Sequence, residues 1–188
     1  MKTDKTKKYL ESFGKYIVKQ ARTILTKKGK NVTKKLYNSL DFKVVETLFG
    51  YEVNFYSADY GVFVDKGVSG TKKKQDYTNP YGESKSSPFR FGTGSSLVSK
   101  AKGGMSGIMS KWVKKKGFQW RDKETGKFMS HKSMGYLIAR SIYSKGIKGV
   151  AFYQRPLQLA LPKFGVELAS ALAGDLRLEI KKINKNIN

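Results

Sequence analysis

The chain has 188 residues, 39% of them hydrophobic, and its 38 Lys and Arg against 14 acids give a formal net charge of +24. This length suits one domain with a buried core, and the apolar content is well above that of a disordered chain. The sequence contains no cysteine, which excludes disulfide bonds, thiolate zinc sites and cysteine nucleophiles.

A surplus of positive charge this large repels itself, so we expect the folded protein to meet an anionic partner or an assembly that offsets the charge. The candidates are nucleic acid, an anionic membrane and acidic neighbouring proteins. No apolar run is long enough to cross a bilayer, and the first residues lack the apolar core of a signal peptide. We therefore expect a protein without membrane contact that is made, and used or assembled, in a reducing cytoplasm.

The first segment is predicted to be an amphipathic helix that ends near Gly29. Its apolar residues recur at spacings of three and four: Leu10, Phe13, Ile17, Ala21 and Ile24. A basic linker follows. Alternating apolar residues then predict a β-hairpin with a turn of four or five residues around ETLFG; these residues are Phe42, Val44, Tyr51, Val53 and Phe55.

The middle of the chain is predicted to be mostly loop. Residues 60–67 fit either a strand or one helical turn, and residues 68–96 are rich in Gly, Ser, Pro and Lys. A loop of that length is usually functional or mobile. A helix weakened by glycines is predicted over residues 96–116, and a second hairpin around the KETGK turn that follows it.

Two more helices are predicted in the last third of the chain. A short one runs through SMGYLIARSIYSKG and ends at Gly146. A long one closes the chain, with Pro162 near its start and one apolar face: Leu157, Leu161, Phe164, Leu168, Leu172, Leu176 and Ile180. The sequence thus predicts an α+β fold, in which a small antiparallel sheet packs against the N-terminal helix and the long C-terminal helix. We expect one domain over residues 1–188, with residues 68–130 as a basic loop-and-hairpin insertion.

The residue types that usually carry catalysis are scarce. The one histidine, His131, lies in the predicted hairpin, at KFMSHKS, and has no acid nearby in the sequence, so we interpret it as a bystander. The acids are scattered without the spacing of metal ligands. Gly92 and Gly94 faintly suggest a phosphate-binding loop, but the Gly-Lys-Ser/Thr ending is missing. We therefore predict no enzymatic activity, no cofactor and no metal ion.

Runs of lysine with aromatic residues close by are the main candidates for partner contact. Lysines can hold phosphates while aromatic rings stack on bases, although such runs are often solvated helix faces. We take as candidates for a partner interface or a DNA path the residues Lys72, Lys73, Lys74, Lys114, Lys115, Lys116, Arg90 and Arg121. No signature of a helix-turn-helix, a zinc finger or an RNA-binding sheet is present.

The segment NVTKKLYNSLDFKVVETLFGYEVNFYSADYGVFVDKGVSG resembles the central region of tail-completion and head–tail connector proteins of tailed bacteriophages, the gene-product-ten-like minor tail proteins. The matching positions are Thr33, Leu36, Ser39, Tyr60, Val64, Asp65, Gly67 and Val68. YLIARSIYSKGIKGVAFYQRPLQLAL is similar to the later element of that family. Two departures are a lysine in place of the usual glycine before Leu36 and a longer basic insert, from about Lys72 to Met129.

The resemblance implies a virion structural protein, without enzymatic activity, that forms a ring at the portal–tail junction. It would be made in the bacterial host cytoplasm and would bind its own copies, portal or adaptor proteins, and tail-tube or other neck proteins. The 68–96 loop and the C-terminal helix would make the contacts between copies or rings. Tyr60, Val64, Asp65 and Gly67 would be scaffold, with Tyr60, Phe63 and Val64 anchoring the sheet against the helices. The alternative is a basic protein that binds nucleic acid without sequence preference.

Overall fold

The computed structural model describes residues 4–30, 33–48, 50–92 and 104–187. Its architecture is α+β, with small antiparallel sheets and helices, as the sequence predicts. The chain forms two compact units. Unit 1 comprises residues 1–65, 78–85 and 150–188, and unit 2 comprises residues 66–77 and 86–149.

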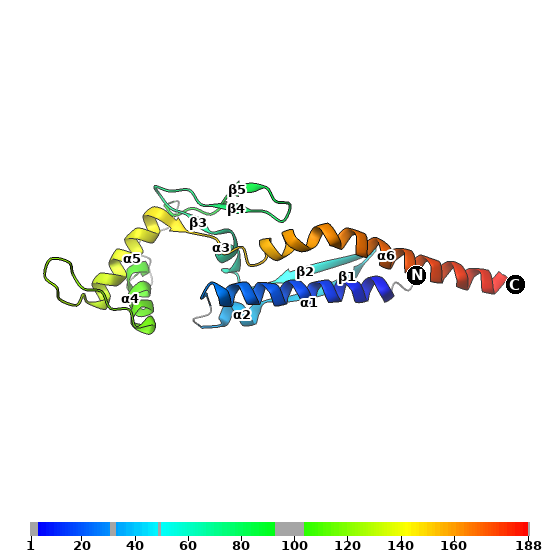
Figure 1. Cartoon of the computed structure of the whole chain (residues 1–188), viewed down its shortest axis with the longest axis horizontal. Helices are drawn as coiled ribbons and strands as arrows, with labels where there is room; N and C mark the ends of the chain where they lie inside the picture. The colour runs from blue at the N-terminus through cyan, green and yellow to red at the C-terminus, as the bar shows by residue number, and fades with distance from the viewer. Residues whose placement is uncertain (1–3, 31–32, 49, 93–103, 188) are drawn as a thin grey trace. The chain divides into compact units, whose positions relative to one another are not determined.

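The helices and strands follow one another in a simple order along the chain (Figure 1). The helices are α1 (Asp4–Lys27), α2 (Lys35–Ser39), α3 (Gly61–Lys66), α4 (Gly104–Lys116), α5 (His131–Lys145) and α6 (Gln154–Ile187). The strands are β1 (Asp41–Thr47), β2 (Gly50–Tyr56), β3 (Val68–Ser69), β4 (Asp76–Thr78), β5 (Ser84–Ser86) and β6 (Gly146–Ile147). They pair as β1 with β2, β3 with β6, and β4 with β5.

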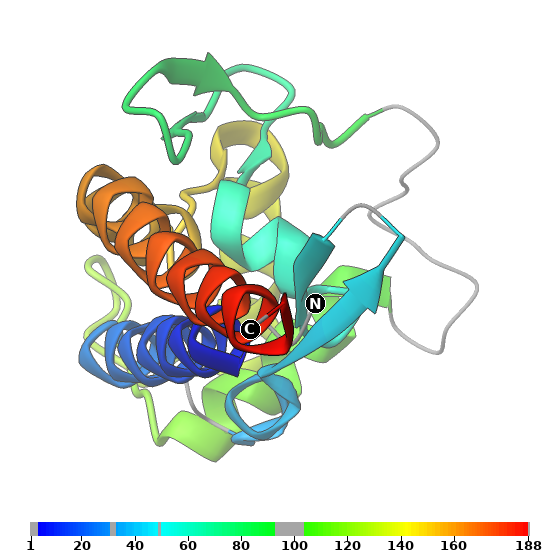
Figure 2. The ribbon, with the colours of Figure 1, turned by 90° about the vertical axis from the view of Figure 1, so that its right-hand side faces the viewer.

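In unit 1, α1 and α6 lie side by side (Figures 1 and 2). They run antiparallel, because Thr6 near the start of α1 contacts Asp175 late in α6, while Leu25 near the end of α1 packs with Phe152 just before α6 begins. α1 ends at Lys27, just before the predicted stop at Gly29, which has φ +63°; the Lys30 N–H then donates to the Leu25 carbonyl oxygen at 3.0 Å.

The hairpin β1–β2 packs its inner face against α1. The Phe42 ring lies directly over Gly14, where an added Cβ would collide with the ring atoms. A side chain at position 14 would therefore push the hairpin away from the helix. Phe55 faces Phe42 across the two strands, with ring centroids 6.4 Å apart.

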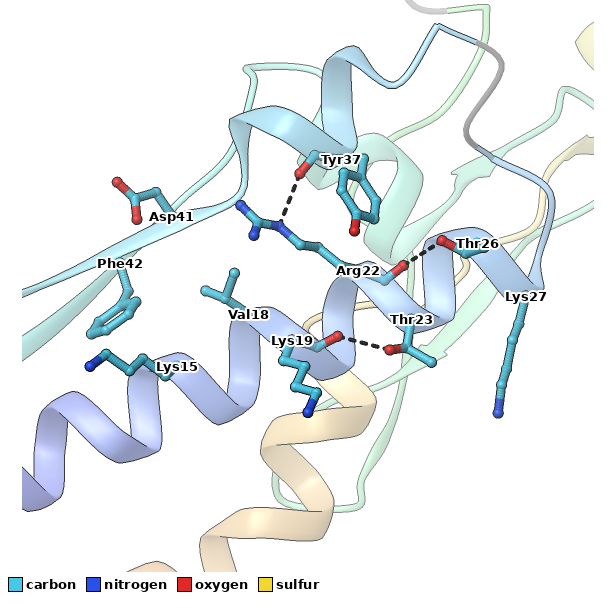
Figure 3. Close-up of a pocket in the computed structure, with 10 residues that line it drawn as sticks. All are labelled: Lys15, Val18, Lys19, Arg22, Thr23, Thr26, Lys27, Tyr37, Asp41 and Phe42. Atoms are coloured by element: carbon cyan, nitrogen blue, oxygen red, sulfur yellow. Dashed lines mark hydrogen bonds between the residues drawn. The ribbon is translucent and has the colours of Figure 1, made fainter.

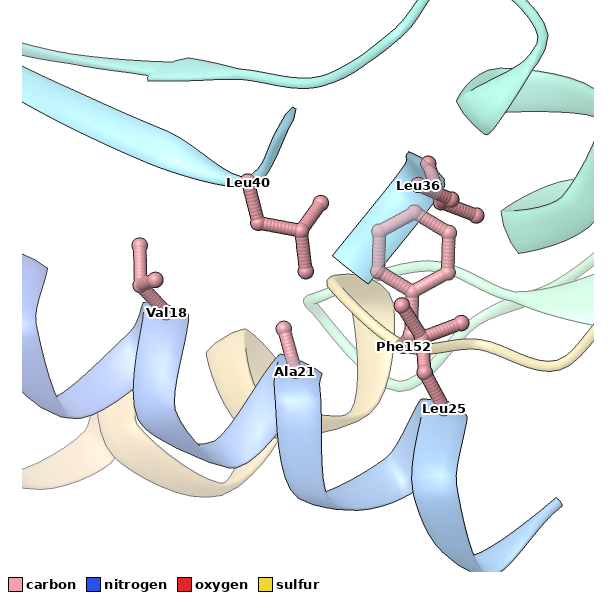
Figure 4. Packing of buried hydrophobic residues seen from close by; sticks show 6 residues of the cluster. All are labelled: Val18, Ala21, Leu25, Leu36, Leu40 and Phe152. Carbon is pink, nitrogen blue, oxygen red and sulfur yellow. The ribbon is translucent and has the colours of Figure 1, made fainter. Parts of the chain in front are cut away.

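The core of unit 1 lies where α1, α2 and the start of α6 meet. Figure 4 shows six of its buried side chains, with the Phe152 ring set between Leu36 and Leu25: Val18, Ala21, Leu25, Leu36, Leu40 and Phe152. Phe152 is the largest side chain in the described part of the chain that is fully buried. Because aromatic residues bury the most apolar area, Phe152 is the main anchor of this core.

A buried carboxylate connects the start of α1 to the C-terminal half of α6. Asp175, 1% exposed, accepts hydrogen bonds from the Thr6 N–H at 2.9 Å, the Thr6 hydroxyl at 2.7 Å and the Lys5 N–H at 3.2 Å. These donors include N–H groups of the first turn of α1, which have no partner inside the helix. Desolvation raises the pKa of Asp175, but the hydrogen bonds and the charge of Lys5 outweigh it, so the pKa lies below its ordinary value of 3.8.

We expect this carboxylate to make unit 1 sensitive to acid. A lowered folded-state pKa means that the unfolded chain takes up the proton first, so the stabilisation is present above the ordinary pKa and is lost as the pH falls through the folded pKa. The measurement is urea unfolding of the wild type and of Asp175→Asn from neutral pH to below pH 3.8. The wild type should have the larger free energy of unfolding at neutral pH, and this difference from the variant should disappear on acidification. A difference that does not change with pH would contradict the assignment.

Unit 2 is built on α4 and α5, which pack against each other as an antiparallel pair. The close approach is at Gly135 of α5, because an added Cβ would lie 2.5 Å from the Ser110 backbone nitrogen and 2.8 Å from the Ser106 carbonyl oxygen of α4. Ser130 caps α5 by accepting the Ser133 N–H at 3.1 Å. Strands β3 and β6 pair beside the end of α5.

The Gly135→Val substitution should destabilise unit 2 by about 1–3 kcal/mol, since the backbone of α4 cannot move aside as a flexible side chain would. Gly165 of α6, with no atom within 4 Å of an added Cβ, is the matched control. Urea unfolding followed by the fluorescence of Trp112 and Trp120 measures the effect. Equal stability of Gly135→Val and Gly165→Val would contradict the close packing of α4 on α5.

Several details differ from the sequence predictions. Residues 35–39 form α2 instead of a linker, and Thr47 pairs with Gly50, so the first hairpin has a shorter turn than the predicted four or five residues. For residues 60–67, where a strand or one helical turn was predicted, the helical alternative is confirmed as α3. Within the predicted loop 68–96, the short strands β3, β4 and β5 are present. The predicted helix over 96–116 is described only from Gly104, since its start lies outside the described residues.

The division into units also differs from the predicted organisation. We expected one domain with an insertion over residues 68–130, whereas unit 2 extends to residue 149 and excludes residues 78–85. The physical reason is that α4 packs against α5, with Val113 of α4 and Met134 of α5 both fully buried, so the two helices belong to the same unit.

Candidate contact surfaces

The segment around α3, which contains Asp65, forms a joint at the start of α6. Asp65, 4% exposed, accepts the Tyr153 N–H at 2.9 Å and the Gln154 side-chain amide at 3.0 Å. Its backbone carbonyl oxygen accepts the Ala151 N–H at 3.0 Å, and the Val64 carbonyl oxygen accepts the Val150 N–H at 2.9 Å. A carboxylate at the N-terminus of a helix satisfies free N–H groups and complements the helix dipole. This segment therefore fixes where α6 begins.

The other predicted scaffold residues have different surroundings. Val64 packs against the core of unit 1, but Tyr60 and Phe63 are 39% and 43% exposed, so they do not anchor the sheet as we expected. Gly67, in unit 2, has φ +78°, and a Cβ there would lie 2.6 Å from the Gly149 backbone nitrogen. Only glycine fits this position, because both the left-handed backbone and the close approach exclude a side chain.

Four of the predicted basic residues gather at the C-terminal end of α5. The Lys72 N–H bonds the Ser144 carbonyl oxygen at 3.0 Å, and the Arg90 guanidinium bonds the Thr71 carbonyl oxygen at 3.2 Å. These bonds hold Lys72 and Arg90 beside the last turn of α5, where Lys145 adds a further positive charge. We call this group, Lys72, Lys73, Lys74 and Arg90, the first basic cluster; all four residues are exposed.

The other four predicted residues lie at the opposite end of the helix pair. Lys114, Lys115 and Lys116 are exposed in the last turn of α4, and Arg121 follows in the turn that leads to α5. The Arg121 guanidinium stacks over the Phe128 ring, 4.6 Å from its centroid. We call these four residues the second basic cluster. Exposed aromatic rings accompany it: Phe118, Trp120 and Phe128.

The structure therefore divides the eight predicted residues into two clusters. The 15 residues of α5 separate them by about 22 Å, which is more than the screening length of about 8–10 Å at physiological salt. Both clusters lie in unit 2, which holds 18 Lys and Arg and 3 acids, a net charge of +15, whereas unit 1 holds the other 20 Lys and Arg and 11 acids, a net charge of +9. Unit 2 is therefore the more basic of the two units.

A groove of about 660 Å³, which no pattern in the sequence predicts, lies between α1 and the start of β1 in unit 1. Figure 3 shows its basic side chains pointing different ways, with Arg22 turned toward Tyr37 and with Lys19 and Lys27 directed away from Arg22. Arg22 donates to the Tyr37 and Leu40 carbonyl oxygens at 3.3 and 2.8 Å. Arg22 thus holds α2 against α1. The basic side chains that line the groove do not point toward one common place.

A second apolar face of α6, distinct from the face predicted from the sequence, is exposed. Its members alternate at spacings of three and four, the pattern of a helix-packing seam. We call it the outer stripe, and it consists of Leu159, Pro162, Val166, Ala169, Ala173, Leu176 and Ile180. Leu159 and Val166 are 65% and 73% exposed. Contiguous apolar surface of this kind marks interaction sites in soluble proteins.

The predicted core face of α6 includes two of these residues, and there the prediction is wrong. Leu157, Leu161, Phe164 and Leu168 are partly buried, but Leu176 and Ile180 are 47% and 56% exposed. The reason is geometric: α1 begins at Asp4, next to Asp175, so α6 continues beyond the start of α1 (Figure 1). In addition, an α-helix has 3.6 residues per turn, so residues spaced four apart shift gradually around the helix and away from its buried face.

Among the described residues, no three His, Cys, Asp or Glu side chains are grouped to hold a metal ion. His131 is the first residue of α5 rather than part of a hairpin. Gly92 has φ +102°, and the predicted partner Gly94 lies outside the described residues. A search of the described helices finds none that is long and apolar enough to span a membrane.

Comparisons with models of protein families, with curated proteins and with solved structures found no match. The described surfaces suited to partner contact are the exposed apolar stripe of unit 1 and the two basic clusters of unit 2, the second with exposed aromatic rings.

Proposed function

We propose that the protein is a structural component of a tailed bacteriophage particle, without enzymatic activity, that forms a ring at the portal–tail junction and completes or connects the tail. The observation that carries this proposal is the outer stripe of α6, since a helix that already packs one face in its own unit keeps a second apolar face for a neighbour. The joint at Asp65 supports it, because the segment that resembles connector proteins serves to position that same helix.

The charge distribution agrees with this role. Rings at the portal–tail junction surround the path of the DNA or meet acidic neighbours, and unit 2 offers two exposed basic clusters for such contacts. The proposed partners are further copies of the chain, the portal or adaptor ring, and tail-tube or other neck proteins. The protein would be made in the host cytoplasm and carried in the virion.

The test is to purify tailed particles from cells that express the chain with its phage and to locate it. We expect mass spectrometry to find the chain in the particles and gold-labelled antibody to mark the junction of head and tail. Particles that lack the chain, or label along the head or the tail fibres, would overturn the proposal.

A second candidate function is binding of nucleic acid without sequence preference, which the second basic cluster favours. Lys114, Lys115 and Lys116 lie beside exposed aromatic rings, and such a surface can hold phosphates and stack bases. Binding of duplex and single-stranded DNA at near-physiological salt distinguishes the two. If this is the function, wild-type binding should weaken steeply with salt, and changing these three lysines to glutamate should flatten the slope, while the equivalent change at Lys7, Lys8 and Lys15 of unit 1 should not.

A further inference from the structure

The C-terminal end of α6 extends beyond the other described residues of unit 1 (Figure 1), and we call it the free end of α6. Twelve residues of α6 follow Asp175, a length of about 18 Å. Leu176 and Ile180 lie on one face, and the same spacing continues in the sequence at Ile183 and Ile187. Anchors at positions i, i+4, i+7 and i+11 are typical of a helix that binds in a groove. So short a stretch gains little stability in water without a partner.

Unit 1 also contains an open apolar groove. It has a volume of about 490 Å³ and lies between α1, β2 and the middle of α6. Four aromatic residues line it, together with Val53 and Leu172: Phe13, Tyr51, Phe55 and Phe164. Leu172 is 38% exposed, so apolar surface in the groove is open to solvent. A groove with these walls fits the apolar face of a helix.

Charge makes the two surfaces complementary. The free end of α6 carries Arg177 and Lys181, and the sequence adds Lys182 and Lys185 against the single acid Glu179. One acid of the hairpin, Glu46, faces the lining residue Tyr51 across the strands and so lies on the groove side, whereas Glu52, between the lining residues Tyr51 and Val53, lies on the other face. The hairpin has three acids and one lysine, in a chain where basic residues far outnumber acids.

We propose that the free end of α6, residues 176–187, packs into this groove on a second copy of the chain. The helix cannot reach its own groove, because α6 is continuous and its end continues away from residues 164–172, which line the groove. Each copy then offers one end and one groove, which is a head-to-tail interface. Such interfaces generate rings when the rotation between copies closes. The inference rests on the proposed function and names the surfaces that join neighbouring copies.

The test uses two complementary variants. The end variant, Leu176→Lys with Ile180→Lys, removes the apolar face of the free helix. The groove variant, Tyr51→Lys, places a positive charge in the groove, where Glu46 across the strands compensates it in the fold. Leu178→Lys is the matched control, since Leu178 is 45% exposed on the opposite side of the same helix end. Circular dichroism and thermal melting establish that each variant is folded; if Tyr51→Lys is not, Leu172→Lys replaces it.

Sedimentation velocity over micromolar to millimolar concentrations is the readout. We expect the wild type and Leu178→Lys to associate and each of the two variants alone to stay monomeric. A mixture of the end and groove variants should form a dimer and nothing larger, because it retains one intact end and one intact groove. A wild type that remains monomeric, or an end variant that associates like the wild type, would overturn the inference. If the end variant still enters particles at the neck, the proposed function stands and only this interface is wrong.

Discussion

Replacing Phe152 by alanine is expected to lower the free energy of unfolding by about 3–5 kcal/mol, the largest effect of any single substitution proposed for this protein. The ring is fully buried and packs against side chains of both α1 and α2, including Leu25 and Leu36. Removing the ring leaves a cavity, and α1, α2 and the start of α6 would all have to move to fill it. Urea unfolding followed by circular dichroism measures the loss.

Phe128→Ala is the control, since it makes the same chemical change at a ring that is 61% exposed. We expect it to cost about 1 kcal/mol or less. If the two variants were equally stable, the core of unit 1 would not lie where α1, α2 and the start of α6 meet.

The second large effect is expected at Asp65. Asp65→Ala should destabilise the protein by about 2–4 kcal/mol, because the Tyr153 N–H and the Gln154 side-chain amide both lose their acceptor at a largely buried position. Asp65→Asn keeps one oxygen acceptor and should therefore lose less stability than Asp65→Ala. Thermal and urea unfolding of both variants measure the effect.

Asp59→Ala is the matched control, because Asp59 is an exposed acid of the same segment. It should leave the stability within about 0.5 kcal/mol of the wild type. The joint at the start of α6 would be wrongly assigned if Asp65→Ala behaved like Asp59→Ala.

Much of the fold follows from local patterns in the sequence. The period of α1 and its stop at Gly29, the alternation of β1 and β2, and the end of α5 at Gly146 are all confirmed. Each depends on residues close together along the chain, which is why periodicity and backbone preference are enough to find them.

The features that the sequence did not predict depend on contacts between distant residues. Asp65 bonds residues almost ninety positions away, and nothing near it in the sequence shows that it caps α6. The outer stripe could have been found from its spacing of three and four, but which face of α6 is buried depends on where α1 begins. The two basic clusters likewise separate only because α4 and α5 pack antiparallel.

The measurement that tests the central claim most directly is the mass of the purified protein by light scattering, at low and high salt, alone and with purified portal complexes. A closed ring, or a monomer that becomes a ring when the portal complexes are added, is the predicted result. A protein that stays monomeric under every one of these conditions, and binds duplex DNA with a steep dependence on salt, would contradict the ring and favour nucleic-acid binding.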